Sequence, residues 1–551
     1  MTTTQPVVGA EDDDRSMSSA GRSRLRRLLK APGLVFFLPA LATLLSCLWG
    51  IDRRSAWRDE HATWWAASLS FGDLYELTRN VDLAIAPYYV FMHLWVSLFG
   101  DSLTALRLPS VLAMAVAGGL VGLLGRRAVG STQGGLVAGL LFALLPTVAR
   151  HGQEARPYAF AMTAALLGFL ALLRALEHPA PRRWVLYALT VPLMGWSHLV
   201  ALTVLVAHLA AVLDARRRSD RNVLGAWLIA VGGGLALVVP LVVLARTQAQ
   251  QIAWNTPAWN DIAAMPYMLF RSPVATVVVL GGAAVALVAA FRRRRGNERD
   301  PGPGSPAGSG SGLGPGSGSG FGLGPGSGPG FGLGRDAGLR ARLTPLTPLA
   351  LWALAPFVLT AATARWLHLF LDRYLLFTVP AWILLATIGL HRLTARPRVV
   401  RRVAVALVAV IAAFAPFDRS TVTRNTPREP DYHSVALRIL ADQRPGDGIA
   451  YTHRLKPRRA LDFELREGAR PRDVLLHGTP QQRADYEAGE CPDPRRCAAG
   501  YERIWLVAAG RSKDPFSGMG QRKSRLLREE FRTVRTADFA NVRLLLLERG
   551  P

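Results

Sequence analysis

The sequence predicts a polytopic α-helical membrane protein with about eleven spans, interfacial helices in its first outer loop and a small C-terminal α/β domain. Half of its 551 residues are hydrophobic and the mean hydropathy is +0.20, which is high for a soluble chain of this length. The apolar residues come in blocks of roughly 17–24, long enough as helix to cross about 30 Å of hydrocarbon. Ionisable residues fall between the blocks, and a more polar tail follows the last one.

The first 31 residues are polar and end in a basic cluster. Five Arg and Lys residues lie between Arg22 and Lys30, directly before the first apolar block. Such clusters mark the cytoplasmic end of a span, and no small-residue cleavage site follows. We therefore expect residues 1–31 to be a disordered cytoplasmic N-terminus, not a cleaved signal peptide.

Eleven apolar blocks are the expected spans. They cover residues 32–50, 107–125, 133–149, 158–175, 183–196, 199–213, 223–245, 272–291, 346–364, 374–390 and 399–416. With this threading, five arginine-rich loops lie on one side, which the positive-inside rule makes cytoplasmic. The membrane domain then comprises residues 32–295 and 343–417, in the plasma membrane, and the tail 418–551 is extracytoplasmic.

The first outer loop, residues 51–106, is long and amphipathic. Residues 86–99 are apolar and aromatic but short for a span, and treating them as a crossing would put the later arginine-rich loops outside. We therefore expect a helix that lies in the outer interface, with Tyr88, Tyr89 and Trp95 at headgroup level. Residues 58–80 show a similar alternation and belong to the same catalytic loop.

Two further regions have a composition of their own. Residues 296–342 are rich in Gly, Pro and Ser and predict a flexible cytoplasmic linker. Residues 418–551 predict a small α/β domain, with a helix at 435–440 and strands at 446–451, 504–508 and 542–547. If this domain is extracytoplasmic, Cys491 and Cys497 can form one small-loop disulfide.

Several function classes are disfavoured by composition. The net charge of +26 is explained by the cytoplasmic loops, and no basic helix with base-reading side chains indicates a nucleic-acid partner. The glycine-rich linker lacks the Lys-Ser/Thr pair of a nucleotide-binding loop. The histidines lack the spacing of a zinc site, so no cofactor is predicted with certainty, and a requirement for a divalent cation is left open.

Polar residues gather where the expected spans end on the outer side. Ionisable groups at membrane depth cost about 2.5–3.5 kcal/mol each, so they usually pair or act in function. The candidate catalytic residues are Asp59 and Glu154. The candidate substrate-binding residues are Glu60, His93, Arg156, Tyr158, His198, Arg373 and Tyr374.

Each candidate also has a purely structural interpretation. Asp59 can be a solvated loop residue, and Glu60 can cap the helix or pair with an arginine. Glu154 can form a local ion pair with Arg156. His198 can satisfy a buried carbonyl group, and Arg373 can anchor a helix end at the interface.

The order of these motifs resembles GT-C glycosyltransferases of the family 39-like branch, which includes protein O-mannosyltransferases and aminoarabinose transferases. The resemblance covers about residues 51–390 and rests on a series of short motifs. They are Trp57-Arg58-Asp59-Glu60, Pro87-Tyr88-Tyr89, Leu106-Arg107-Leu108-Pro109-Ser110, Gln153-Glu154-Ala155-Arg156-Pro157-Tyr158 and Arg373-Tyr374-Leu375-Leu376. The chain departs from that branch at Ala86-Pro87, where two prolines and a cationic residue are common.

The resemblance implies an inverting transferase with a polyprenyl-phosphate-linked sugar, mannose by analogy, as donor. The acceptor would be an extracytoplasmic protein, glycolipid or cell-envelope glycan. Asp59 would be the general base and Glu154 would orient the acceptor or a cation. Arg373, with Arg156, would hold the leaving phosphate.

Three other functions remain as alternatives. A transporter or flippase of lipid-linked sugars would place polar groups near the bilayer midplane and show an internal repeat, neither of which the sequence displays. A polymerase that uses lipid-diphosphate donors would favour a large outer loop late in the chain. A non-catalytic scaffold would tolerate substitution of Asp59 and Glu154.

Overall fold

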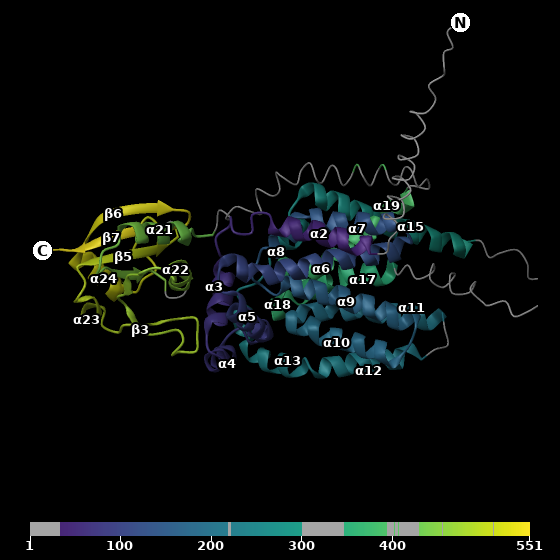
Figure 1. The fold of residues 1–551 in the computed structure, drawn as a ribbon, viewed down its shortest axis with the longest axis horizontal. Helices are drawn as coiled ribbons and strands as arrows, with labels where there is room; N and C mark the ends of the chain where they lie inside the picture. The colour runs from purple at the N-terminus through teal and green to yellow at the C-terminus, as the bar shows by residue number, and fades with distance from the viewer. Residues whose placement is uncertain are drawn as a thin grey trace, which may run out of the picture.

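The protein consists of a bundle of helices and a separate C-terminal α/β domain at one end of the bundle (Figure 1). This computed structural model describes residues 33–218, 222–299, 346–393, 429–453, 456–510 and 512–550, with isolated positions 402 and 406. The expected N-terminal segment 1–31, all but the first residues of the linker 296–342, and nearly all of the last expected span, 399–416, lie outside the described residues.

Each of the first ten expected spans coincides with helical structure. The elements are α2 (Leu34–Leu48), α6 (Leu103–Val129), α7 (Thr132–Leu144) with α8 (Pro146–Gly152), α9 (Tyr158–Glu177), α10 (Pro181–Ser197), η2 (Leu199–Val204) with α11 (Leu205–Arg218), α12 (Val223–Ala236) with α13 (Val239–Ala245), α15 (Pro273–Arg299), α17 (Leu346–Ala362), and η4 (Asp372–Thr378) with α19 (Val379–Leu393). Shorter connections are η3 (Arg246–Ile252), α14 (Trp259–Phe270) and α18 (Ala364–Leu367).

Within the described residues, five helices are long and apolar enough to cross a membrane by themselves. Two further pairs of helices are bent, by 62° between α7 and α8 and by 46° between α12 and the segment Val239–Ile252. If each pair forms one span, the number rises to seven. The helices α2, α10 and α17 have only 15, 17 and 17 residues, and such lengths reach about 23–26 Å. The protein is a multi-pass membrane protein, but the predicted count of eleven spans is not confirmed.

Glycine allows α2 and α6 to pack at close range. A Cβ at Gly122 would lie 2.1 Å from the carbonyl oxygen of Val35, and one at Gly118 would lie 2.2 Å from the hydroxyl of Thr43. Close backbone approach of this kind stabilises helix pairs in lipid, where water provides no hydrophobic drive between them.

The arginine-rich helix ends lie at the end of the bundle away from the C-terminal domain. The C-terminal ends of α11 and α15 point to that end (Figure 1). Arg127 near the end of α6 pairs with Glu177 at the end of α9, so these two helix ends also share a side. The structure thus agrees with the loop pattern of the threading, whereas the side of the membrane that each end faces stays a prediction.

The first outer loop folds into short helices between the bundle and the C-terminal domain (Figure 1). They are α3 (Arg58–Ser68), α4 (Phe71–Asn80), η1 (Leu83–Ile85) and α5 (Ala86–Phe99). The helix expected at 86–99 is present. Tyr88 and Tyr89 are buried with Trp64 in an apolar cluster of this loop, and their expected place at headgroup level stays a prediction.

The C-terminal part is an α/β domain, as predicted. Its elements are α21 (Tyr432–Asp442), β1 (Gly448–Tyr451), α22 (Lys456–Glu464), β2 (Arg472–Asp473), β3 (Leu476–Gly478), β4 (Gly489–Glu490), α23 (Pro494–Ala498), β5 (Arg503–Ala509), α24 (Gln521–Glu530), β6 (Phe531–Phe539) and β7 (Val542–Arg549). The main sheet has the order β2-β1-β5-β7-β6. β1 is parallel to β2 and β5, and β7 is antiparallel to β5 and β6.

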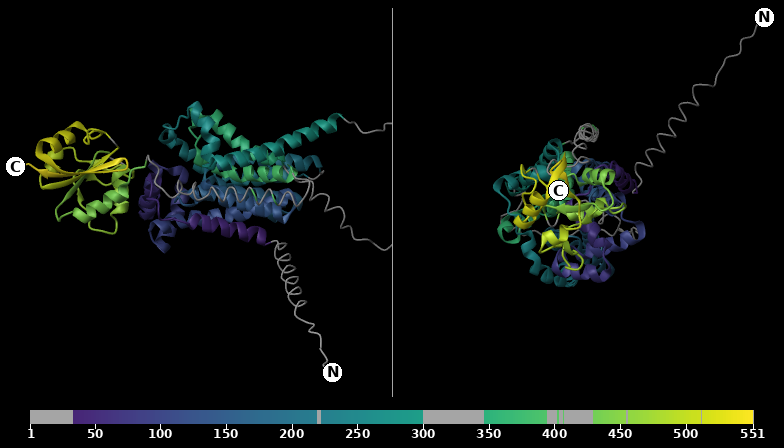
Figure 2. Two further views of the ribbon diagram at one scale, coloured as in Figure 1. Left: turned by 90° about the horizontal axis from the view of Figure 1, so that it is seen from above. Right: turned by 90° about the vertical axis from the view of Figure 1, so that its left-hand side faces the viewer.

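Helices cover both faces of this sheet (Figure 2). Residues of α21 and α22 pack on one face around Trp505, and residues of α23 and α24 pack on the other around Leu506. Both faces of β5 are therefore buried, which explains why its sequence is a continuous apolar run. The Cys491–Cys497 disulfide is formed, which confirms that expectation.

The C-terminal domain docks onto the first outer loop through aromatic side chains. The ring of Phe463 lies 5.6 Å from the ring of His61 and 5.2 Å from that of Trp64. The hydroxyl of Tyr486 donates a hydrogen bond of 2.8 Å to the Asp82 carboxylate, which also accepts one from Tyr89. These contacts hold the domain against α3, whose second residue is the predicted catalytic residue Asp59.

Candidate functional site

The two adjacent carboxylates of the first loop lie in the first turn of α3. The carboxylate of Glu60 accepts a hydrogen bond of 3.2 Å from the backbone N–H of Trp57, the N-cap residue of α3. Successive helical residues point about 100° apart, so Asp59 and Glu60 meet different surroundings. The Asp59 side chain is 21% exposed, whereas that of Glu60 is fully buried.

Glu60 forms a bidentate ion pair with Arg107 of α6, with both N–O distances at 2.8 Å. Its carboxylate also accepts the backbone N–H of Ala155 at 3.0 Å. Arg107 in turn donates to the backbone carbonyls of Ile51, Arg54 and Ser55. Burial raises the pKa of Glu60, but the attraction of Arg107 outweighs it and the pKa lies below its usual value.

Glu154 belongs to the same buried network. It accepts a hydrogen bond of 3.0 Å from Arg150, lies 3.2 Å from Nδ1 of His151, and pairs with Arg54 at 3.5 Å. We call Arg54, Glu60, Arg107, Arg150, His151 and Glu154 the ion-pair cluster. Burial raises the pKa of Glu154, yet His151 and the two arginines hold it well below its usual value. Glu154 is therefore an ionised carboxylate bound by protein groups.

A second group of side chains lies at the ends of α9, α10 and η4. Arg156 lies over the ring of Tyr158 at 5.9 Å, and Arg373 lies over the rings of Trp57 and Tyr374 at 5.6 and 5.7 Å. The His198 ring packs 4.5 Å from Tyr374 and 5.9 Å from Tyr158. The carboxylate of Asp59 is near enough to act electrostatically on Arg156 and Arg373.

We call Asp59, Arg156, Tyr158, His198, Arg373 and Tyr374 the arginine–tyrosine cluster. Neither Arg156 nor Arg373 forms an ion pair with a carboxylate in the part of the chain that the structure describes, and the Nε of each is buried without a hydrogen-bond partner. Two such guanidinium groups beside one carboxylate form a net positive, partly buried site. Guanidinium groups bind phosphate oxygens in bidentate geometry, so this site suits an anionic group of that kind.

Two candidates lie apart from this cluster. His93 bonds the carbonyl of Ala67 at 3.0 Å and packs 4.2 Å from Phe71, and no hydrogen bond or ring contact among the described residues links it to the arginines. Glu154 likewise has no described contact with Asp59. The predicted roles of His93, Glu60 and Glu154 in binding or catalysis stay predictions.

The sequence reasoning missed three residues that shape the site. Arg107 and Trp57 were noted only as members of motifs, and Arg54 was not considered. Arg54 is fully buried and donates to the Gln153 carbonyl at 2.9 Å. Burial and then the charge of Arg150 lower its pKa to about 10. The available signal was the position of Arg54 directly after the first apolar block, where a cation at membrane depth needs a partner.

Among the described residues, no group of three or more His, Cys, Asp or Glu side chains could hold a metal ion. The carboxylates of the ion-pair cluster are already neutralised by arginine.

Comparison with known proteins supports the same interpretation of the bundle. Residues 86–244 match the family model of dolichyl-phosphate-mannose-protein mannosyltransferase. The predicted resemblance to GT-C glycosyltransferases is confirmed. The fold is similar to that of ArnT from Cupriavidus metallidurans in the apo state, with a TM-score of 0.56 and 13% identity over 92% of this chain and 97% of that one.

A second structure of that protein, bound to undecaprenyl phosphate, gives a TM-score of 0.54 and 14% identity over the same shares of the two chains. No curated protein sequence matches the chain. At this level of identity, the ArnT structures show a common fold.

Proposed function

We propose that the protein is an inverting glycosyltransferase that moves a sugar from a polyprenyl-phosphate donor to an extracytoplasmic acceptor, which is a protein, a glycolipid or a cell-envelope glycan. The observation that carries the proposal is the arginine–tyrosine cluster, where Arg156 and Arg373 form no ion pair with a carboxylate of the described residues and lie beside the half-buried Asp59. An anion-binding pair next to a carboxylate is what displacement of a phosphate by a hydroxyl requires.

In this reaction, the acceptor hydroxyl attacks the anomeric carbon from the face opposite the phosphate. The new carbon–oxygen bond forms as the bond to the phosphate oxygen breaks, and that oxygen leaves with the electron pair. Asp59 takes the hydroxyl proton, which positioned general-base catalysis accelerates about 10²–10⁴-fold. The guanidinium groups of Arg156 and Arg373 stabilise the charge that develops on the leaving phosphate.

The ion-pair cluster would act as the support of this site. The bidentate pair of Glu60 with Arg107 holds the first turn of α3, and Ala155 N–H binds the same carboxylate. Asp59 lies one residue from Glu60, and Arg156 lies one residue from Ala155, whose backbone N–H binds Glu60. We propose Glu60 and Glu154 as positioning residues, through which the two reactive groups keep their relative placement.

The comparisons support the donor class. The family model is named for dolichyl-phosphate-mannose, and ArnT has been solved with undecaprenyl phosphate bound. Both are polyprenyl phosphates, and a chain with the same fold and a phosphate-suited site is expected to use a donor of this class. Mannose is the sugar we propose first.

The test uses the purified full-length protein in sealed liposomes with labelled polyprenyl-phosphate mannose and a cell-envelope fraction, with and without chelator. We expect transfer of label to the envelope fraction, and NMR of the product should show an anomeric configuration opposite to that of the donor. Parallel reactions with glucose and aminoarabinose donors identify the sugar. Retention of configuration, or label that crosses the bilayer without transfer, would contradict the proposal, and the latter would favour a flippase.

A further inference from the structure

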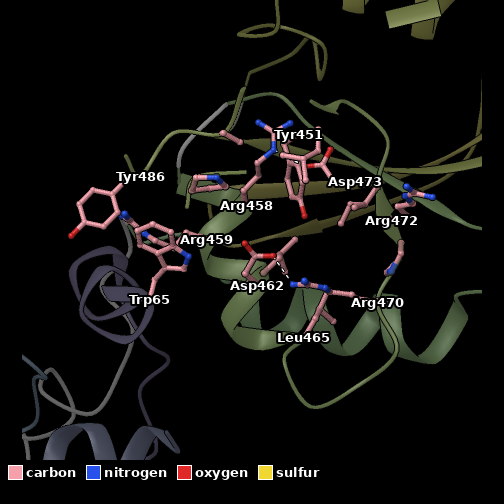
Figure 3. A pocket seen from close by; sticks show the side chains of 16 residues that line it. Trp65, Tyr451, Arg458, Arg459, Asp462, Leu465, Arg470, Arg472, Asp473 and Tyr486 are labelled. Atoms are coloured by element: carbon pink, nitrogen blue, oxygen red, sulfur yellow. Dashed lines mark hydrogen bonds and ion pairs between the residues drawn. The ribbon is translucent and has the colours of Figure 1, made fainter. Parts of the chain in front are cut away.

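A cavity of about 330 Å³ lies between the C-terminal domain and α3, outside the arginine–tyrosine cluster (Figure 3). Its walls come from α22, β1, β2 and the segment around Tyr486, and Trp65 of α3 closes one side. The volume lies within the range of small-ligand sites, about 300–1,000 Å³. Neither the proposed phosphate site nor the ion-pair cluster contributes a residue to it.

The wall toward the membrane domain is aromatic. The rings of Trp65 and Tyr486 meet edge to face at 5.6 Å, and the guanidinium of Arg459 stacks over Tyr486 at 4.4 Å. Figure 3 shows these three side chains together at one end of the cavity. Rigid aromatic faces with polar edges suit the apolar faces and hydroxyl rims of sugar rings.

The rest of the lining is charged, with an excess of cations. Four arginines, Arg458, Arg459, Arg470 and Arg472, face two aspartates, Asp462 and Asp473. Asp462 accepts from Arg470 at 2.7 Å, and Asp473 accepts from Arg458 at 2.7 Å.

Two of the four arginines therefore have no carboxylate partner in the lining. Arg459 donates one hydrogen bond of 3.3 Å to the carbonyl of Arg58, while its Nε and Nη1 are buried and have no hydrogen-bond partner among the described residues. Arg472 is exposed and forms no ion pair with any described residue. Buried donors without acceptors cost about 1–3 kcal/mol each, so this lining favours a ligand that supplies anionic oxygens.

The cavity is also linked to the proposed reaction centre through α3. Trp65 follows Asp59 by six residues on the same helix, which corresponds to about 9 Å along its axis. The hydrogen bond from Arg459 to the Arg58 carbonyl joins the cavity to the residue next to Asp59.

We propose that this cavity binds an anionic saccharide unit, carrying a carboxylate or phosphate, in the acceptor of the transfer reaction. The identification of this saccharide as the acceptor rests on the proposed function, whereas its binding to the cavity does not. Arg459 and Arg472 would bind the anionic group, Trp65 and Tyr486 would pack on the ring, and Asp462 would accept hydroxyl hydrogen bonds.

The test measures binding of digalacturonate and of neutral digalactose to the full-length protein in detergent, without donor, by calorimetry and tryptophan fluorescence. We expect digalacturonate to bind at least about tenfold more tightly, since hydrogen bonds to charged groups contribute more than neutral ones. Arg472→Gln should weaken digalacturonate binding about 5–10-fold and leave digalactose nearly unaffected. A phosphorylated disaccharide in a third titration separates a carboxylate from a phosphate preference.

The matched control is Arg532→Gln, because Arg532 is exposed on β6 at the opposite edge of the sheet from β2. Equal affinity for the acidic and neutral sugars, equal losses in the two arginine variants, or no binding of either sugar at millimolar concentration would overturn the proposal. Asp59→Asn should bind digalacturonate like the wild type, so a failure of the transfer chemistry is distinguishable from a failure of this site.

Discussion

The ion-pair cluster and the arginine–tyrosine cluster begin at neighbouring residues but differ in how their charges are compensated. Glu60 is fully buried and bonded to Arg107 and two backbone N–H groups. Asp59, one residue earlier, is partly exposed and pairs with the half-exposed Arg58 at 3.3 Å. It also lies near Arg156 and Arg373, which form no ion pair with a carboxylate of the described residues.

This difference indicates that the charged partners of a carboxylate, more than its residue type, distinguish a structural role from a catalytic one. A carboxylate whose lone pairs are already taken by arginine is a poor base and cannot approach a substrate. An arginine without a protein partner is the better candidate for an anionic ligand, because the unmet cost of its burial favours ligand binding.

The largest expected effect concerns the reactivity of Asp59. Asp59→Asn should lower the transfer rate about 10²–10⁴-fold, because the amide cannot take the acceptor proton. Donor affinity and thermal stability should change little. Rates with the labelled donor, read against Asp52→Asn at an exposed position of the same loop, measure this. Full activity of Asp59→Asn would remove Asp59 as the base.

The corresponding amide substitution at the next residue, Glu60→Gln, should lower the stability of the fold. Glu60→Gln leaves the Arg107 guanidinium buried without its partner, and breaking such a pair costs about 3–5 kcal/mol. Thermal unfolding in detergent should therefore shift strongly for Glu60→Gln and hardly for Asp59→Asn. A Glu60→Met/Arg107→Met double variant should recover part of the loss. Equal stabilities of the two single variants would mean that the clusters do not differ as described.

A smaller effect is expected for the arginines of the arginine–tyrosine cluster. Arg373→Gln should weaken donor binding about 10–100-fold, since a charge-assisted hydrogen bond contributes about 1.5–3 kcal/mol. Arg156→Gln should do the same, and Arg373→Lys should restore only part of the affinity because ammonium cannot bind phosphate oxygens in bidentate geometry.

Donor titration by fluorescence anisotropy measures these affinities. Arg53→Gln, at an exposed position of the first outer loop, controls for long-range charge. If Arg53→Gln weakened binding as much as Arg373→Gln, the effect would be general electrostatics and not a phosphate contact.

The smallest effect concerns pH and the docking of the C-terminal domain. Burial, and then the charge of Arg459, lowers the pKa of His61 to about 3, while Glu60 and Arg107 act in opposite senses. The unfolded chain takes up this proton near pH 6.5, and the folded protein does not until about pH 3. The free energy of unfolding should therefore fall as the pH drops from 6.5 toward 3, by about 1 kcal/mol between pH 6.5 and pH 5.5.

His61→Gln should remove this slope, and unfolding midpoints at pH 7.0, 6.0 and 5.0 measure it. His477→Gln is the control, because His477 is exposed in the C-terminal domain, which packs on His61 through Phe463. An unchanged slope in His61→Gln would show that another group controls the acid sensitivity.

Periodicity and composition predicted much of the architecture. The helical blocks, the helix at 86–99 and the C-terminal α/β domain follow from apolar runs that local sequence reveals. Strand β2 was missed because it has only two residues. The edge strand β6 was missed because its middle residues are exposed and form no apolar run. The span number stayed open because short helices and bent pairs have the composition of a span without its length.

The sequence by itself determined that this is a membrane protein with a charged first outer loop and arginine at particular helix ends, since hydrophobicity and charge are properties of local composition. Only the tertiary structure decided which of these charges are compensated. Arg107 lies 47 residues from Glu60, and Trp65 meets Tyr486 across the interface between two domains. Pairing of this kind depends on how distant elements pack, so no local pattern could have separated the proposed base from its buried neighbour.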